Sequence, residues 1–203
     1  MSASNERRPW PMKWVVLAIV VVIVPYTFLT LRYRKEGPAF QPYQDMKNRA
    51  NVSRLLAAGY QRMPLTAHRP ADSLHLLRSV TATRAPGGLP AELKATLIEA
   101  PLLPTEILQV SAAPTANGVQ AYPIQFTCRL PDDQQMLAGA ELYLKNDEAV
   151  IVPTFERVGG DLMTRTREPA VVVTIPAGVL KPGPHRITVA AERSGATWEV
   201  DVR

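Results

Sequence analysis

An uninterrupted apolar run near the N-terminus constrains this chain more than any other feature of its sequence. Residues 14–31 carry no charged side chain, and Lys13 and Arg32 flank them. As an α-helix the run would be about 27 Å long, close to the thickness of the hydrocarbon core of a bilayer. Tryptophan and tyrosine residues lie near both ends, where aromatic rings favour the membrane–water interface. The run therefore predicts a transmembrane helix, preceded by a short tail of residues 1–13.

A cleaved signal peptide is the alternative interpretation of this segment. A signal peptide has an apolar stretch of only about 7–15 residues and ends in a small-x-small cleavage site. This run is longer, and it passes directly into Leu31-Arg32-Tyr33-Arg34. We therefore expect an uncleaved anchor in the cell inner (plasma) membrane.

The orientation of the anchor is open from sequence. Three Lys or Arg residues precede the run and five follow it up to residue 50, a count that would place the C-terminal part in the cytoplasm. A short tail, one anchor and a long domain is the usual signal-anchor layout, in which the domain crosses the membrane. We favour a periplasmic or other extracytoplasmic location for the C-terminal domain.

The positive charge of the chain is concentrated beside the anchor. The chain as a whole has a formal charge of +5. Residues 32–84 hold ten Lys or Arg and three Asp or Glu, whereas residues 85–203 hold ten and fourteen. Anionic lipid head groups attract such a basic segment. A nucleic-acid-binding protein would instead carry basic residues on its folded domain, so we expect no nucleic-acid partner.

Residues 32–92 are predicted to form a basic juxtamembrane helix followed by a connector. Pro42 suits the first turn of a helix over residues 42–60, and Gly59 suits its end. Such a helix, with basic and apolar residues, could lie on a membrane surface, dock on a partner subunit or pack against its own domain. The residues predicted to contact the membrane surface or a partner are Arg32, Arg34, Lys35, Lys47, Arg49 and Arg54.

Short strand-like segments separated by turn residues fill residues 93–203, and Leu74–Thr83 is one more strand candidate. Alternation of apolar and polar residues is plain in Ile124–Leu130 and Trp198–Val202, which predicts strands with one buried face. Nineteen prolines argue against a helical bundle. The predicted fold is mainly β, an antiparallel β-sandwich. Its strands are expected at Lys94–Glu99, Ile107–Ser111, Ala121–Leu130, Ala140–Lys145, Ala149–Phe155, Ala170–Ile175, His185–Glu192 and Thr197–Val202.

The closing stretch, from Leu180-Lys181-Pro182-Gly183 through the strand to Glu192 and on to Trp198-Glu199-Val200, resembles the last two strands of immunoglobulin-like domains of bacterial envelope proteins. The resemblance covers about a quarter of the chain and implies an immunoglobulin-like sandwich. It implies no activity. The overall layout is similar to that of FixH-type assembly factors of respiratory oxidases, although no motif matches residue by residue.

The sequence offers no catalytic or metal-binding constellation. Cys128 lies mid-strand, on the same alternation face as Phe126 and Leu130, and is expected to be a small buried apolar residue. His68, His75 and His185 are not at metal-ligand spacing, and no Gly-x-Ser-x-Gly or phosphate-binding loop occurs. We expect no cofactor, no metal and no small-molecule substrate.

A long polar loop over residues 156–168 is a candidate contact surface, because loops at one end of a sandwich often carry contacts. Its candidate residues are Arg157, Met163, Arg165 and Arg167. The alternative is a loop with no partner.

These features favour a single-pass, non-catalytic accessory, assembly or structural subunit of a larger membrane complex. The alternative is an anchored envelope module whose loops bind a ligand or mediate adhesion. An enzyme whose site is not visible in the sequence is a third hypothesis.

Overall fold

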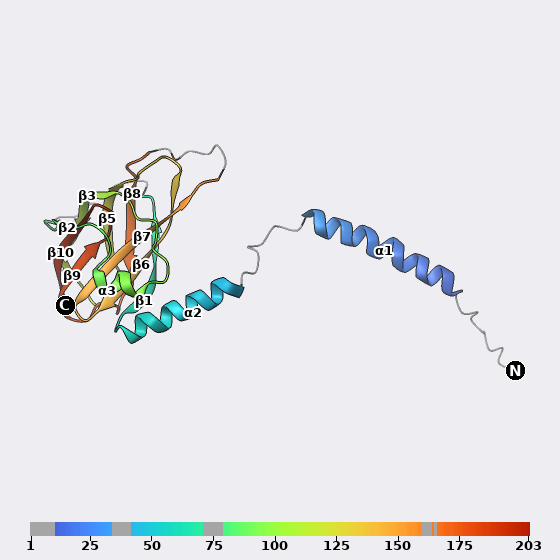
Figure 1. Cartoon of the computed structure of the whole chain (residues 1–203), viewed down its shortest axis with the longest axis horizontal. Helices are drawn as coiled ribbons and strands as arrows, with labels where there is room; N and C mark the ends of the chain where they lie inside the picture. The colour runs from blue at the N-terminus through green and yellow to red at the C-terminus, as the bar shows by residue number, and fades with distance from the viewer. Residues whose placement is uncertain (1–10, 34–41, 71–78, 160–163, 165) are drawn as a thin grey trace. The chain divides into compact units, whose positions relative to one another are not determined.

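The structure is a computed structural model, and it describes residues 11–33, 42–70, 79–159, 164 and 166–203. These residues form two compact units, Met1–Pro42 and Tyr43–Arg203. The first contains helix α1, and the second contains the other helices and all strands of the described segments (Figure 1).

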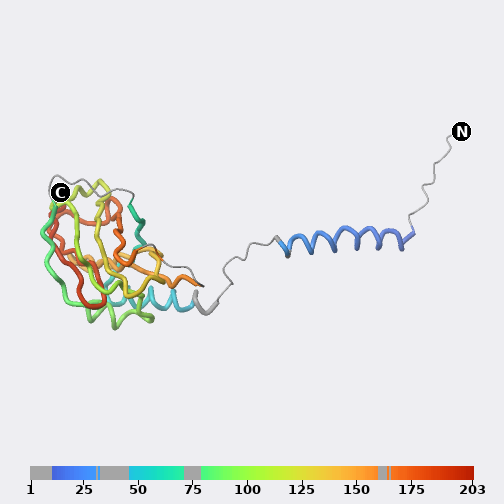
Figure 2. The backbone as a smooth tube through the Cα atoms, turned by 90° about the horizontal axis from the view of Figure 1, so that it is seen from above, coloured from blue at the N-terminus to red at the C-terminus, as the bar shows by residue number. Residues whose placement is uncertain are grey.

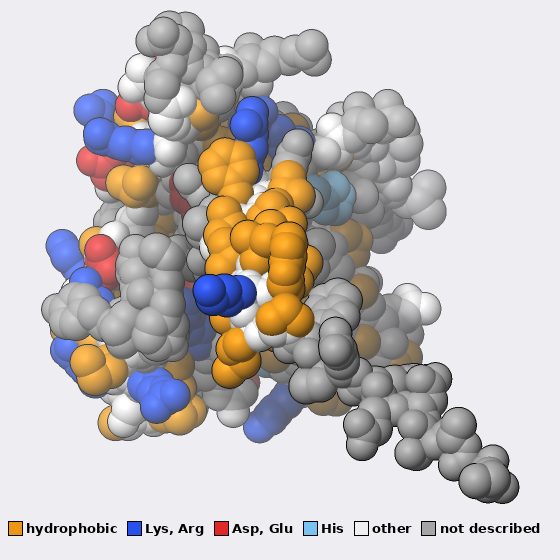
Figure 3. Space-filling view, turned by 90° about the vertical axis from the view of Figure 1, so that its right-hand side faces the viewer, with side chains coloured by type: hydrophobic (Ala, Val, Ile, Leu, Met, Phe, Trp, Pro, Cys, Tyr) orange, Lys and Arg blue, Asp and Glu red, His pale blue; other side chains and the backbone are white. Residues whose placement is uncertain are grey.

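Helix α1 spans Met12–Tyr33, two residues beyond the predicted helix at each end, and continues through Pro25. Its 22 residues rise about 33 Å, enough to cross a hydrocarbon core. Its hydrophobic side chains form a continuous exposed surface (Figure 3). Within the described segments it is the one helix long and apolar enough to span a membrane, although a signal sequence would share both properties.

The second unit is mainly β, as predicted, and contains two short helices. Helix α2 spans Pro42–Ala57 and α3 spans Ala91–Thr96. The strands are β1 (Gln61–His68), β2 (Thr83–Pro86), β3 (Glu106–Ala112), β4 (Thr115–Ala116), β5 (Tyr122–Arg129), β6 (Gln135–Lys145), β7 (Glu148–Arg157), β8 (Ala170–Ile175), β9 (Gly183–Val189) and β10 (Ser194–Val202).

Eight of these strands close into a barrel-like ring. Their order is β10-β3-β5-β8-β1-β6-β7-β9, and β9 pairs again with β10. The β9–β10 hairpin runs antiparallel over seven residue pairs, from Ala196 opposite Val189 to Val202 opposite Gly183. The short strands β2 and β4 add to β10. Hydrogen bonding thus continues around the whole domain, and two separate sheets of a sandwich are not confirmed.

The expectation of purely antiparallel pairing is wrong. Strand β9 runs parallel to β7, with Glu148 opposite Arg186 and Ile151 opposite Val189. The reason lies in the connection: after β7 the chain forms β8 between β5 and β1, and then returns to the outer edge of β7. A strand that returns after such a crossover can run in the same direction as its new neighbour.

Two segments differ from the sequence-based expectation. Strand β1 lies within the predicted connector, and it joins β6 to β8 in the ring. Residues 94–99, predicted as a strand, form none: residues 94–96 are the second half of α3, where Leu93 and Thr96 are buried one turn apart, and residues 97–99 follow the helix. Short apolar runs do not distinguish a strand from a helix, and Pro90 directly before Ala91 suits a helix start.

The main hydrophobic core fills the inside of the ring. Alternate residues of each strand point inward, for example Val171, Val173 and Ile175 of β8. Phe126 and Cys128 of β5 are also in this core. The prediction that Cys128 is a small buried apolar residue is therefore confirmed.

A second, smaller core lies on the outer face of β6 and β7, beneath α2 and α3. Leu55 of α2 and Leu93 of α3 pack there with Tyr143, Val150 and Val152. Strand β7 is consequently buried on both faces, with Ala149 and Ile151 inside the ring and Val150 and Val152 under the helices. This outer layer makes the C-terminal part of α2 a component of the domain (Figure 1).

Replacing Gly195 by alanine is expected to destabilise the domain by about 1–3 kcal/mol, because a close-packed site does not accept an added methyl group. A Cβ atom at Gly195 would lie 2.5 Å from the Val189 carbonyl oxygen, at the β9–β10 turn. Urea unfolding of the detergent-solubilised full chain, followed by the far-ultraviolet signal of the sheet, measures the change. The matched control is Gly159→Ala, where a Cβ would meet no atom within 4 Å. Equal unfolding midpoints for the two variants would contradict this account.

Candidate contact surfaces

The predicted basic contact residues of α2 do not share one surface. The Arg54 guanidinium donates a hydrogen bond to the Ala95 carbonyl oxygen at 2.8 Å, and the Lys47 ammonium lies 3.8 Å from the Glu99 carboxylate. Both side chains therefore bind the domain's own α3 region. Arg49 is exposed. The structure thus pairs Lys47 and Arg54 with the α3 region, although Arg54 is itself exposed, and places Arg49 on a different side of the helix.

The remaining basic residues predicted beside the anchor are only partly described. Arg32 is exposed in the last turn of α1. Arg34 and Lys35 lie outside the described residues.

Helix α2 also has apolar residues that are exposed, away from its buried side. Leu55 is 1% exposed in the second core, whereas its neighbour Leu56 is 62% exposed. Met46 and Val52 are also exposed. One side of the helix is therefore buried, and the other is exposed.

The predicted contact loop is attached to the domain at its C-terminal end. The Leu130 N–H donates to the Arg167 carbonyl oxygen at 2.8 Å, and the Arg167 side chain lies 3.3 Å from the Asp133 carboxylate. Arg157 is exposed at the end of β7. Met163 and Arg165 lie outside the described residues. Arg157 and Arg167 are thus both exposed, but Arg167 already has an internal partner.

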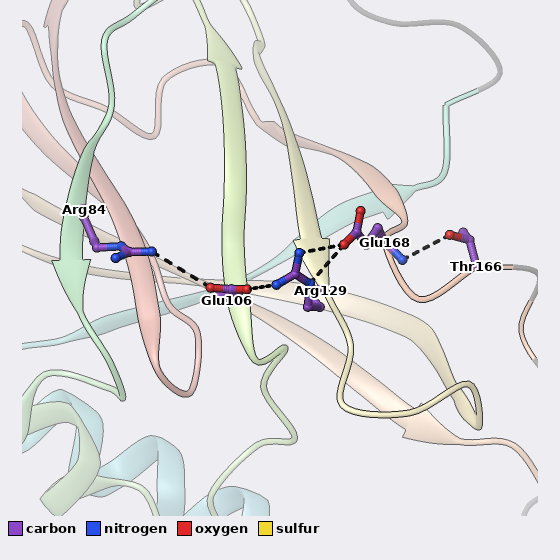
Figure 4. A network of polar contacts seen from close by, with 5 residues as sticks. All are labelled: Arg84, Glu106, Arg129, Thr166 and Glu168. Carbon is purple, nitrogen blue, oxygen red and sulfur yellow. Dashed lines mark hydrogen bonds and ion pairs between the residues drawn. The ribbon is translucent and has the colours of Figure 1, made fainter.

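A chain of charged side chains joins this loop to three strands (Figure 4). The Arg129 guanidinium donates to Glu106 of β3 and, at 2.8 and 2.9 Å, to Glu168 at the loop's end. Arg84 of β2 lies 4.0 Å from Glu106. The hydrogen bond to Glu168 raises the pKa of Arg129. The network joins the loop to the strands. Because its groups are solvent-accessible, its ion pairs add little to the stability of the domain.

A groove of about 900 Å³ lies along the outer side of the β9–β10 hairpin, next to β2. Its polar lining includes Thr81, Thr83, Arg186, Thr188, Thr197 and Glu199. The Thr188 hydroxyl donates to the Thr197 hydroxyl at 3.0 Å, and Arg186 lies 3.7 Å from Glu199. Sequence reasoning missed this groove, because its walls come from residues 80–91 and 186–199, which pair only in the fold. The one sequence signal was the Pro86-Gly87-Gly88 turn at its rim.

A polar hollow beside the β6–β7 turn contains Tyr60, Glu92 and Lys145. The Lys145 ammonium donates to Glu92 at 2.6 Å and lies 5.1 Å from the centre of the Tyr60 ring. The hydrogen bond with Lys145 lowers the pKa of Glu92 and raises that of Lys145, and burial raises the pKa of Tyr60. Glu92 and Lys145 are therefore both charged, and the Tyr60 phenol is neutral. The Glu92–Lys145 pair links α3 to the sheet.

A second tyrosine stands beside an ion pair on β1 and β6. The Tyr143 hydroxyl and the Arg62 guanidinium both donate to the Glu141 carboxylate. Burial raises the pKa of Tyr143, and the hydrogen bond to Glu141 raises that of Arg62. Tyr143 therefore stays protonated and Arg62 stays charged near neutral pH.

Cys128 and His185 are buried in the domain. Burial raises the pKa of the Cys128 thiol to about 12. His185 is buried, and its Nε2 lies 2.7 Å from the Lys181 carbonyl oxygen. Among the described residues, no group of three or more His, Cys, Asp or Glu side chains could hold a metal ion.

The comparisons with known proteins add no identity to this geometry. No protein-family model, no curated protein and no solved structure matches the chain.

Cys128 is expected to resist alkylation in the folded chain. With a thiol pKa of about 12, the reactive thiolate is scarce at pH 8, and the surrounding core also excludes the reagent. Iodoacetamide at pH 8 should therefore modify the urea-unfolded chain rapidly and the folded chain hardly at all, as measured by intact mass. Equal rates in the two states would show that Cys128 is accessible.

Proposed function

We propose that this chain is a single-pass, membrane-anchored and non-catalytic accessory, assembly or structural subunit of a larger membrane protein complex. One observation carries the proposal. The chain combines an exposed apolar helix of membrane-spanning length with a domain whose charged side chains pair with one another. Arg129, Glu168, Lys145 and Glu92 are examples of such internal pairing.

The proposed location is the inner membrane, with α1 retained as an anchor and the barrel-like domain on the extracytoplasmic side. The length of α1 and the basic residues that follow it support retention over cleavage. The proposed partners are lipid and the membrane subunits of the complex, with respiratory complexes as the class suggested by the layout. An immunoglobulin-like relationship of the domain is part of this proposal, supported by the β9–β10 hairpin.

The second candidate is an anchored envelope module that binds a ligand. The groove beside β9 and β10 favours it, because threonine hydroxyls and the Arg186–Glu199 pair are groups that hydrogen-bond a polar, hydroxylated ligand such as a glycan.

Affinity purification of the full chain after gentle detergent extraction tests the accessory role. We expect membrane subunits of one complex to co-purify in fixed stoichiometry, because an accessory subunit binds its partners through specific contacts. The matched control replaces α1 by an unrelated apolar span of equal length, which separates contacts of α1 from contacts of the domain.

A monodisperse monomer with no partner under these conditions would contradict the accessory role and favour the ligand-binding candidate. The intact mass of the purified chain tests the anchor separately. The proposal predicts 22.3 kDa for the unprocessed chain, and a mass lacking the α1 segment would identify a signal peptide instead.

A further inference from the structure

The outer side of α2 combines apolar and basic side chains that do not contact the domain core. Met46, Val52 and Leu56 are 64%, 43% and 62% exposed, and Arg49 is exposed between them. Residues spaced three or four apart lie on one side of a helix, so Arg49, Val52 and Leu56 form one stripe, with Met46 one turn before Arg49. We call these four residues the outer stripe of α2.

The opposite side of the same helix is already occupied. Leu55 is in the second core, Arg54 binds the Ala95 carbonyl oxygen, and Lys47 lies beside Glu99. The helix therefore cannot turn the outer stripe inward without breaking these contacts. Whatever covers the outer stripe must come from outside the domain.

The chain itself limits where the outer stripe can be. Helix α1 ends at Tyr33 and α2 begins at Pro42. Even a fully extended segment over residues 34–41 spans only about 30 Å. If α1 spans the membrane, as the proposed function holds, α2 remains within that distance of the bilayer surface.

The distribution of charge favours an orientation in which α2 faces the bilayer. Residues 32–57, which run from the end of α1 to the end of α2, carry four net positive charges, whereas residues 58–203 carry one net negative charge. An anionic membrane surface attracts the first segment and does not attract the second. The domain would thus turn its α2 side to the lipid.

Additional apolar surface lies near the first half of α2. Ile98 and Leu102 are 40% and 44% exposed. The contact between Lys47 and Glu99 places their segment beside the first half of α2.

We propose that the outer stripe of α2 lies on the lipid bilayer and holds the domain against the membrane surface. An amphipathic helix with apolar residues and a basic side chain binds in this way, with its apolar face among the acyl chains and its cation at the head groups. This inference rests on the proposed anchor, and it goes further by naming the surface and the lipid as its occupant.

The test uses the full chain in nanodiscs that contain lipid, the scaffold protein and no other membrane protein. A cysteine introduced by Leu56→Cys is labelled with the environment-sensitive fluorophore NBD, and the buried Cys128 provides no competing site. The matched control is Val119→Cys. Val119 is 82% exposed, and the adjacent Gly118 N–H bonds the Arg203 carbonyl oxygen, at the C-terminus, which lies on the side of the domain away from α2 (Figure 2).

We expect quenching by iodide in the buffer to be several-fold weaker at position 56 than at position 119, and quenching by spin-labelled lipid to be stronger. In discs containing anionic lipid, Arg49→Glu should reduce the protection at position 56, because it reverses the attraction to the head groups. Val52→Cys provides a second label on the outer stripe, so the test does not depend on one variant.

Equal iodide quenching at positions 56 and 119, in both neutral and anionic discs, would overturn the proposal. Protection that occurs in native membranes and is absent in discs without other membrane proteins would also overturn it, since the occupant would then be a protein partner. That second result would leave the accessory role intact. Failure of the chain to enter nanodiscs at all would instead count against the anchor.

Discussion

Strand β9 holds the domain closed, because it pairs with β7 on one side and with β10 on the other. Without these two ladders the sheet would have two open edges, and open edges invite pairing with other chains. Closure encloses the main core and also fixes β7 between two apolar layers. The outer layer over β7 is where α2 and α3 bind. The docking of the juxtamembrane helix therefore depends on the closed ring beneath it.

Much of the strand pattern could be predicted from local sequence, and the pairing could not. Alternation in residues 124–130 and 198–202 marks strands with one polar face, and these strands are present as β5 and β10. Strand β1 was missed because Pro64 interrupts the pattern. Proline is tolerated there because β1 pairs with β6 alone over Gln61–Leu65, so a missing N–H need not break a second ladder. The parallel return of β9 beside β7 joins residues far apart in sequence and leaves no local signal.

The candidate surfaces could be predicted only in outline. The sequence shows that basic residues follow the anchor. It does not show which side of α2 packs on the domain and which side is exposed. The continuous apolar run Ala149-Val150-Ile151-Val152 was the signal for that cover, because a strand with no polar alternates is buried on both faces. Once Leu55 is assigned to the outer layer, Arg54 faces α3 and Arg49 faces away. The groove beside β9 has no comparable signal, since its two walls meet only through the pairing of β2 with β10.

The central claim is that α2 is part of the folded domain and links it to the anchor, and hydrogen–deuterium exchange of the full chain in nanodiscs tests this most directly. A 16-residue helix is marginal by itself, so strong protection of its amides must come from packing. The account predicts that amides in the second half of α2 exchange as slowly as those of β7. Leu55→Ala should release α2 by removing about 2–5 kcal/mol of packing, whereas Leu56→Ala should not. Rapid exchange of α2 in the unsubstituted chain, or equal effects of the two substitutions, would contradict the claim.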